Sequence, residues 1–332
     1  MSVKRIEGYR NFCNKLWNAA RYAMLQLDGK GAEATGERPQ ATALINRWIL
    51  SRLDVALAAA NQGVHEYRLD DATLGLYHFV WNELCDWYLE LTKPLLAGGD
   101  PGGTTRERDE AEALAKETRA TLVHVLESVL RALHPMMPFI TEEIWQNVPK
   151  RAGHAKACAV AAYPQAGKEG LRDEAAEKEL TWLSSVISAA RAIRAEHDLA
   201  PKKHLSLTVR TGEAEKRALL SSQKGAIETL CNATLTLEDA SDVIPEHTAT
   251  AVAEGITVLV PLTGLVDMAK EKERVTRELS KVEKDLMVLA KKLGNADFIA
   301  RAPAEVIAKD TARKAELEAA KQKLGDALKQ MA

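Results

Sequence analysis

The sequence predicts a mainly α-helical protein in three parts: a helical bundle over residues 1–150, a small α+β domain over 170–262, and a C-terminal antiparallel coiled-coil hairpin over 265–332. Three observations lead to this prediction. Apolar residues recur at three- and four-residue steps through most of the first 150 positions. Short segments with strand-like alternation follow between residues 205 and 260. A heptad repeat then begins at residue 275.

Composition narrows the class of protein. A chain of 332 residues has room for two or three domains. The net charge of −2 gives no overall bias toward nucleic acid, so any such role must come from local patches. The four cysteines are scattered with no C-x-x-C pair, which argues against a disulfide framework or a zinc site and favours a reducing compartment. With no signal-peptide pattern and no long apolar run, we expect a cytoplasmic protein without a membrane span.

The first predicted helix has two contrasting faces. The residues expected to be buried follow helical spacing: Ile6, Tyr9, Cys13, Leu16, Trp17, Ala20, Met24 and Leu27. The opposite face is a polar stripe: Asn11, Asn14, Lys15, Asn18, Arg21 and Tyr22. Asparagine costs roughly 0.6 kcal/mol of helix propensity relative to alanine, so an ordinary solvated face would favour other residues. The stripe suits nucleotide edges and phosphates, or else its amides hydrogen-bond a neighbouring helix or domain.

Four further helices complete the predicted bundle. One covers residues 44–63, and another runs from about Asp70 to Pro94, which should kink or end it. A third covers residues 106–133 and ends before two prolines. Thr141 is the expected N-cap of a short last helix. The residues expected to be buried in the first two of these helices are Leu44, Ile45, Trp48, Ile49, Leu53, Ala56, Leu57 and Ala60, and then Leu74, Tyr77, His78, Trp81, Leu84, Cys85, Tyr88 and Leu91.

The second domain combines helices at residues 173–197 and 213–230 with strands at 205–209, 234–237 and 255–260.

The C-terminal segment has the clearest periodicity. The first seam is spaced 4-3-4-3-4: Val275, Leu279, Val282, Leu286, Leu289 and Leu293. A break at residues 294–297 and a restart at Pro303 precede a weaker second seam: Leu317, Leu324, Leu328 and Met331. Two heptad helices joined by a short break are expected to fold back as a hairpin. In the alternative, the first seam mediates dimerisation.

Residues typical of catalysis are missing. No histidine has a second ligand at metal spacing, so His78 and His124, which lie in apolar helical stretches, are expected to be core residues. No serine or cysteine has the context of a nucleophile, and no Walker A or dinucleotide-binding motif occurs. By itself, the chain therefore looks like a binding module without metal or cofactor.

Four motifs carry a resemblance to a known family. Residues 10–21 (RNFCNKLWNAAR), 81–94 (WNELCDWYLELTKP) and 134–145 (HPMMPFITEEIW) are similar to the anticodon-binding domain of bacterial valyl-tRNA synthetases, which are class I aminoacyl-tRNA synthetases. Residues 298–303 (FIARAP) are similar to the coiled-coil tRNA arm of that family. This sequence has a coiled-coil hairpin where a cysteine-rich zinc module would otherwise stand, which makes it resemble the valyl family rather than the isoleucyl and leucyl relatives.

The resemblance implies a tRNA-binding C-terminal portion of a valine–tRNA ligase that acts as a monomer on tRNA(Val). The family's His-Ile-Gly-His-type and Lys-Met-Ser-Lys-Ser-type motifs and its editing domain do not occur in the sequence. We therefore expect no activity from this chain alone, with ATP and Mg²⁺ bound only by the absent catalytic domain. The residues expected to contact the anticodon region are Asn14, Lys15, Asn18, Arg21 and Tyr22. The residues expected at the outer corner of the tRNA are Lys291, Lys292, Arg301 and Arg313.

Three alternatives remain open at this point. The chain can be a free-standing coiled-coil interaction protein, an RNA-binding paralogue, or a fragment of the related isoleucyl-tRNA synthetase.

Overall fold

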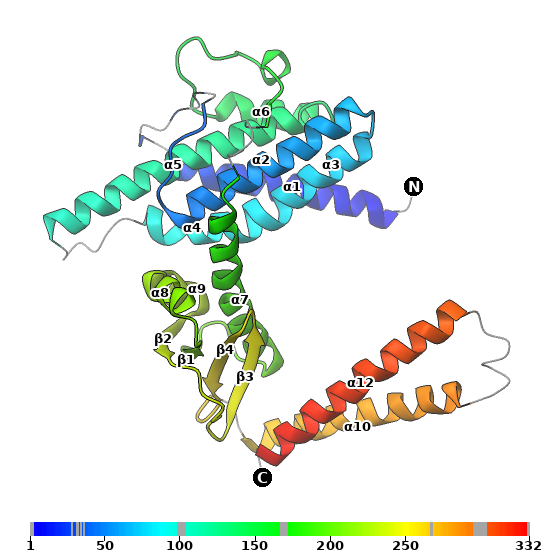
Figure 1. The fold of residues 1–332 in the computed structure, drawn as a ribbon. Coiled ribbons are helices and arrows are strands. Elements are labelled where there is room, and N and C mark those ends of the chain that lie inside the picture. Colours follow the sequence, from blue (N-terminus) through cyan, green and yellow to red (C-terminus); the bar gives the residue numbers. More distant parts are fainter. Residues whose placement is uncertain are drawn as a thin grey trace. The chain divides into compact units, whose positions relative to one another are not determined.

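The computed structural model describes residues 3–27, 29–30, 33, 35, 37–97, 104–166, 172–265, 268–294 and 304–330. The chain forms two compact units, one of residues 1–184 with 218–230 and one of 185–217 with 231–332. Most of the structure is helical, with one small four-stranded sheet (Figure 1). The mainly α fold class is therefore confirmed. The division at 1–150, 170–262 and 265–332 stays a prediction.

The first unit contains the helical bundle. Its helices are α1 (Val3–Leu27), α2 (Leu44–His65), α3 (Leu69–His78), the π-helical η1 (Phe79–Tyr88), α4 (Leu89–Leu96), α5 (Thr105–Leu133) and α6 (Pro138–Asn147). Helix α5 contacts α1, α2, α3, α4 and α6, so it is the centre of the bundle. The largest side chains that are fully buried come from every one of these helices except α4: Leu16, Ile49, Leu50, Leu53, Leu76, Leu84, Tyr88, Leu122, Leu126, Leu130, Leu133 and Trp145.

A buried polar network fixes the start of α2. Its N-cap, Ala43, has no side chain that can accept the free backbone N–H groups. The carboxylate of Glu117 on α5 instead accepts from the two backbone N–H groups just before the helix, those of Thr42 at 2.9 Å and of Ala43 at 3.0 Å. Asn46 also donates to Glu117, and it accepts from the hydroxyl of Tyr88 at 2.9 Å. One carboxylate thus ties the start of α2 to α5.

The buried face of α2 is confirmed, but that of α1 is rotated by about one residue. Ile6, Tyr9 and Trp17 were predicted to be buried and are 54%, 58% and 43% exposed. The residues that α1 buries are Phe12, Leu16, Ala19, Ala20, Ala23 and Leu27. Three small alanines pack closely on the bundle, and the larger Trp17 and Tyr9 lie at the edges of the contact.

The predicted helix from Asp70 to Pro94 is longer and less regular than expected. The backbone N–H of Leu89 bonds to the carbonyl of Leu84, an i to i−5 bond that marks the π-helical turns of η1. This wider turn shifts the buried positions of η1 away from 3.6 periodicity. Leu74 and His78, which lie ahead of it in α3, are exposed against expectation. The helix also continues through Pro94 to Leu96, where the prediction ended or kinked it.

The start of α6 also differs from the prediction. Pro138 occupies the first turn, where its missing N–H costs nothing, and Met137 is the N-cap. Thr141, predicted as the N-cap, lies inside the helix, where its buried hydroxyl donates to the carbonyl of Met137 at 2.8 Å. Helix α5 agrees with the prediction and begins with a capping box between Thr104 and Glu107.

Helix α7 (Glu174–Glu196) leads from the first unit into the second, which contains the sheet. The strands are β1 (Leu205–Arg210), β2 (Ala233–Glu238), β3 (Thr248–Ala253) and β4 (Ile256–Pro261), in the order β2-β1-β4-β3. β1 and β2 are parallel and are connected through α8 (Ala214–Ser222) and α9 (Lys224–Cys231), while the other pairs are antiparallel.

Strand β3 was not predicted. It forms a hairpin with β4 through Glu254 and Gly255, which both have positive φ.

The last two helices, α10 (Met268–Leu293) and α12 (Ala304–Gln330), pack against each other (Figure 1). Ion pairs join Lys292 to Asp310 at 2.7 Å and Glu283 to Lys321 at 2.9 Å, so the two helices run in opposite directions. The described residues of the first seam are half-buried: Leu279, Val282, Leu286, Leu289 and Leu293. Leu317 of the second seam is buried. Residues 295–297 of the predicted break, the restart at Pro303, and Met331 fall outside the described residues.

None of the helices in the described ranges combines the length and apolar character needed to cross a bilayer.

Candidate nucleic-acid interface

The predicted polar stripe lies on the open face of α1. Asn11, Asn14, Asn18 and Arg21 are exposed, and Tyr22 is half-buried. Within the described part of the chain, neither Asn14 nor Asn18 hydrogen-bonds a neighbouring helix. The amides and the guanidinium are therefore available to a ligand, which favours the ligand-binding interpretation of the stripe over the structural one.

Lys15 is the member of the predicted set with a clear partner in the fold. Its ammonium lies 2.5 Å from the carboxylate of Asp86 and 4.1 Å from the ring centroid of Trp81. Trp81 also stacks on Tyr77 and Phe12, with ring centroids 5.7 and 6.5 Å away. Lys15 therefore joins α1 to η1, and a phosphate would have to compete with Asp86 for its charge.

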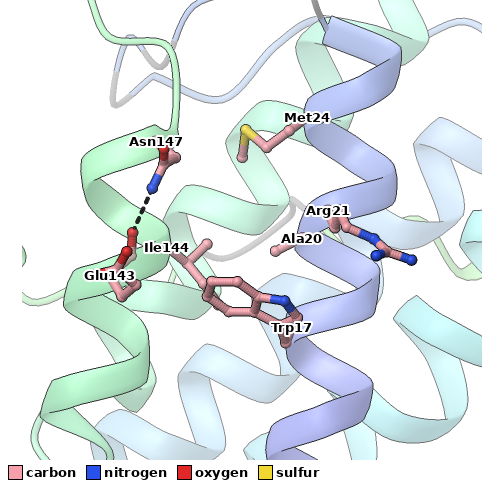
Figure 2. Close-up of a pocket in the computed structure, with 7 residues that line it drawn as sticks. All are labelled: Trp17, Ala20, Arg21, Met24, Glu143, Ile144 and Asn147. Carbon is pink, nitrogen blue, oxygen red and sulfur yellow. Dashed lines mark hydrogen bonds between the residues drawn. The ribbon is translucent and has the colours of Figure 1, made fainter.

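A cavity of about 410 Å³ lies beside the stripe, between α1 and α6. Its lining consists of Trp17, Ala20, Arg21, Met24, Glu143, Ile144 and Asn147. Figure 2 shows Trp17 extending from α1 toward Ile144, while the guanidinium of Arg21 points away from α6. Three members of the lining, Trp17, Ala20 and Arg21, belong to the motif at residues 10–21. The cavity thus adds, beside the polar stripe, a recess whose walls are both aromatic and polar.

A second, larger cavity of about 760 Å³ lies along the N-terminal half of α1. It is mostly apolar, with Tyr9 and Cys13 of α1, Leu74 of α3, and Met136 and Met137 of the turn before α6 among its lining residues.

The predicted arm residues lie on or between the last two helices. Lys291 is exposed, Lys292 pairs with Asp310, and Arg313 pairs with Glu316 at 2.8 Å on its own helix. Arg301 lies outside the described residues. The structure thus brings Lys291 and Lys292 together at the end of α10 and places Arg313 on α12.

The thiols and histidines of the described residues do not form a reactive centre. All four cysteines are free. Burial raises the pKa of Cys85 and Cys158 to about 12 and that of Cys231 to about 11, so these thiols stay protonated. In the ranges that the structure describes, no three histidine, cysteine or carboxylate side chains are grouped to hold a metal ion.

His124 is largely buried as expected, but its ring Nδ1 has no hydrogen-bond partner among the described residues, where a satisfied core histidine was expected. Burial lowers its pKa to about 4, and Arg38 and Arg131 act in the same direction.

Two family models match the chain. The anticodon-binding domain of tRNA ligases matches residues 46–209, and the tRNA-binding arm of valyl-tRNA synthetase matches residues 267–332. The helical bundle from residue 46 onward and the paired C-terminal helices therefore correspond to the anticodon-binding domain and the tRNA-binding arm of aminoacyl-tRNA synthetases.

Curated relatives give the particular family. The chain is 41% identical over 336 residues to the valine–tRNA ligase of Nitratidesulfovibrio vulgaris, which covers 99% of this chain and 35% of the relative. It is 38% identical to the valine–tRNA ligase of Carboxydothermus hydrogenoformans, over 97% of this chain and 35% of the relative. The corresponding enzyme of Xanthomonas campestris pv. campestris is 40% identical over 93% of this chain and 32% of its own length.

The chain belongs to the valyl-tRNA synthetase family and corresponds to the C-terminal part of these relatives. It spans about a third of their length.

Sequence reasoning did not identify Glu143 and Asn147 as part of a recess, and it assigned Trp17 to the core. The spacing of Trp17 fits either face, because it lies one position from Leu16 on the boundary between the two. Its partners on α6 are more than 120 residues away in the sequence, so no local pattern could reveal the cavity.

Proposed function

We propose that this chain binds tRNA(Val), holding the anticodon loop on the open face of α1 and the outer corner of the tRNA on α10 and α12. In this proposal it serves ATP-dependent valine–tRNA ligation, which is carried out by catalytic and editing domains outside this chain. The observation that carries the proposal is the exposed set of amides and a guanidinium on α1, within a chain of the valyl-tRNA synthetase family. Such groups can read the edges of splayed loop bases.

The roles of the stripe residues differ in the proposal. Asn14, Asn18 and Arg21 contact base edges or stack on bases, and Tyr22 offers an aromatic platform. Lys15 has a phosphate role only if the RNA displaces Asp86. A phosphate carries the kind of negative charge that Asp86 supplies, so it can replace Asp86 as the partner of Lys15 at low ionic strength, where charge attraction is strongest.

The paired helices α10 and α12 are proposed to be a coiled-coil hairpin. Lys291, Lys292, Arg301 and Arg313 would contact phosphates or stack at the outer corner of the tRNA. A helix of about 26 residues extends roughly 39 Å, which is enough to place such contacts far from the anticodon loop.

The protein is proposed to act as a monomer in the cytoplasm and to hold no cofactor of its own. Support for a monomer comes from the heptad seam of α10, whose described residues are half-buried against α12 of the same chain. ATP and Mg²⁺ would bind only the catalytic domain.

Two measurements test this function. Filter binding should detect a complex with a tRNA(Val) transcript, and the affinity should fall when the anticodon is changed. ATP–pyrophosphate exchange with valine should stay at background. Equal affinity for every tRNA would contradict anticodon recognition, and exchange above background would show that the chain itself activates valine.

A further inference from the structure

We propose that the cavity between α1 and α6 binds one unstacked nucleobase of the RNA loop, stacked on Trp17 and recognised at its edge by Glu143 and Asn147. This inference rests on the proposed function, because it adds a base-specific pocket to the surface that receives the loop. Its ligand class is a single nucleobase that directs an N–H donor toward Glu143.

The size and lining of the cavity suit a base. Its volume of about 410 Å³ falls within the ~300–1,000 Å³ typical of small-molecule sites. Apolar groups of Ala20, Met24 and Ile144 line it, and polar groups come from Glu143 and Asn147 on α6. A planar, mostly apolar ring with a polar edge matches this combination.

Trp17 is the stacking surface. It is 43% exposed, although it sits in a helix whose other large apolar residues nearby, Phe12 and Leu16, are buried. Helix α1 packs on the bundle through Phe12, Leu16 and Leu27 together with three alanines, so the half-exposed indole is not needed to fill the core. Figure 2 shows the indole beside the recess, facing Ile144. An exposed tryptophan at the wall of a cavity is a platform on which a loop base can stack.

The polar side chains of Glu143 and Asn147 determine which base edge the cavity accepts. The carboxylate of Glu143 is a pure acceptor, so the base must direct an N–H toward it, and a carbonyl oxygen at that place would be repelled. Asn147 donates one N–H to the backbone carbonyl of Glu143 at 2.9 Å, as Figure 2 shows. This bond orients its amide and leaves the second N–H and the carbonyl oxygen for the base.

The charges around the recess favour different places for the base and for the phosphate of the same nucleotide. Glu143 is negative, so the recess disfavours a phosphate. The guanidinium of Arg21 points away from α6 (Figure 2) and lies on the same exposed stripe as Asn18. The base therefore enters the recess while its phosphate stays on the open face of α1.

A panel of anticodon stem-loops tests the inference, with each loop nucleotide replaced in turn by an abasic one. At one position of the loop, the abasic change should weaken binding to the unmodified protein by at least about fivefold, as loss of a stacked base does. Trp17→Leu should remove the sensitivity at that position alone, and Trp17→Phe should retain most of it.

Glu143→Gln tests whether residue 143 recognises the edge of the bound base. An amide can donate as well as accept, so the base preference at that same position should shift by at least about fivefold toward a base with a carbonyl there. The matched control is Glu7→Gln, which removes the same charge from an exposed site on α1. It should change the affinity for all loops equally.

The outcomes are distinct. If the protein binds the stem-loops but neither Trp17→Leu nor Glu143→Gln changes the profile at any single position, the pocket does not hold a base, and the proposed function stands. If no stem-loop binds at all, both the pocket and the proposed anticodon recognition are contradicted.

Discussion

Lys15 shows how one residue can belong to a binding motif and to the fold at once. Its ion pair with Asp86 is partly exposed, and its ammonium also lies over Trp81. Exposed ion pairs contribute up to about 1 kcal/mol, and cation–π contacts at exposed sites about 0.5–1 kcal/mol.

Lys15→Ala should therefore lower the free energy of unfolding by about 1 kcal/mol in urea denaturation. Arg21→Ala, at an exposed site, should change it by less than about 0.5 kcal/mol. Lys15→Ala should also weaken cognate and changed-anticodon RNA alike. If it leaves stability unaltered and weakens RNA binding strongly, Lys15 is free in solution and the pair with Asp86 does not form.

His124 gives stability a pH dependence of known sign. Its pKa is about 4 in the folded protein and about 6.5 in an unfolded chain. The unfolded chain therefore binds more protons between these values. The stabilisation from neutral His124 is complete above pH 6.5 and is lost as the pH falls toward 4.

Between pH 7 and 5, the free energy of unfolding should fall with a slope of up to about 1.4 kcal/mol per pH unit from this residue. Denaturation curves of the unmodified protein and of His124→Gln measure it, and the slope should be shallower in the variant. Identical slopes would mean that the pKa of His124 is the same in the folded and the unfolded protein.

Among the elements, α2, α5 and α7 could be predicted closely because hydrophobic spacing, a capping box and prolines mark their faces or ends. The buried face of α1 could not be predicted in this way, because both faces of the helix carry aromatic residues. In addition, alanine is too weakly apolar to mark the tightly packed positions in a hydrophobic pattern. In η1, the i to i−5 bonds change the period itself, which no 3.6-residue pattern detects.

The stripe on α1 followed from local spacing alone. The recess did not, because α6 meets Trp17 only in the folded bundle, where it packs on both α1 and α5. Strand β3 was missed for a different reason. Its sequence, TATAVA, alternates small residues whose apolar character is too weak to stand out, although the Glu-Gly turn after it signals a hairpin.

The arm formed by α10 and α12 is an element with its own prediction. Changing Lys291, Lys292, Arg301 and Arg313 together to Ala should weaken tRNA binding and flatten the log–log salt dependence by about two to four units, since phosphate contacts release counterions. Discrimination between anticodons should be unchanged. Binding isotherms at several salt concentrations measure both quantities.

A second quadruple variant controls for net charge: Lys93, Arg106, Lys178 and Lys224 changed to Ala, all outside the proposed RNA surfaces. Its salt slope should stay close to that of the unmodified protein. Equal slopes for the two quadruple variants would show that the arm does not contact phosphates.

For the whole molecule, the competing explanation of the heptad seam is dimerisation. The seam residues of α10 are half-buried against α12 in the same chain, so sedimentation equilibrium should give the mass of one chain, 36.4 kDa. Adding tRNA(Val) should give a one-to-one complex. A stable dimer that ignores tRNA would instead favour an interaction protein.

The central claim is that the polar stripe of α1 reads the anticodon, and one ratio tests it most directly. The quantity is the affinity for a tRNA(Val) transcript divided by that for the same transcript with a changed anticodon. It is measured for the unmodified protein, for Arg21→Ala, and for Arg10→Ala, which removes an exposed arginine near the other end of the same helix.

Loss of a base-edge contact costs about 1–3 kcal/mol, so Arg21→Ala should lower this ratio by roughly fivefold or more. Arg10→Ala should leave the ratio unchanged, even if it weakens both affinities. If Arg21→Ala is fully folded and retains the complete ratio of the unmodified protein, the anticodon is read elsewhere and the account of α1 is wrong.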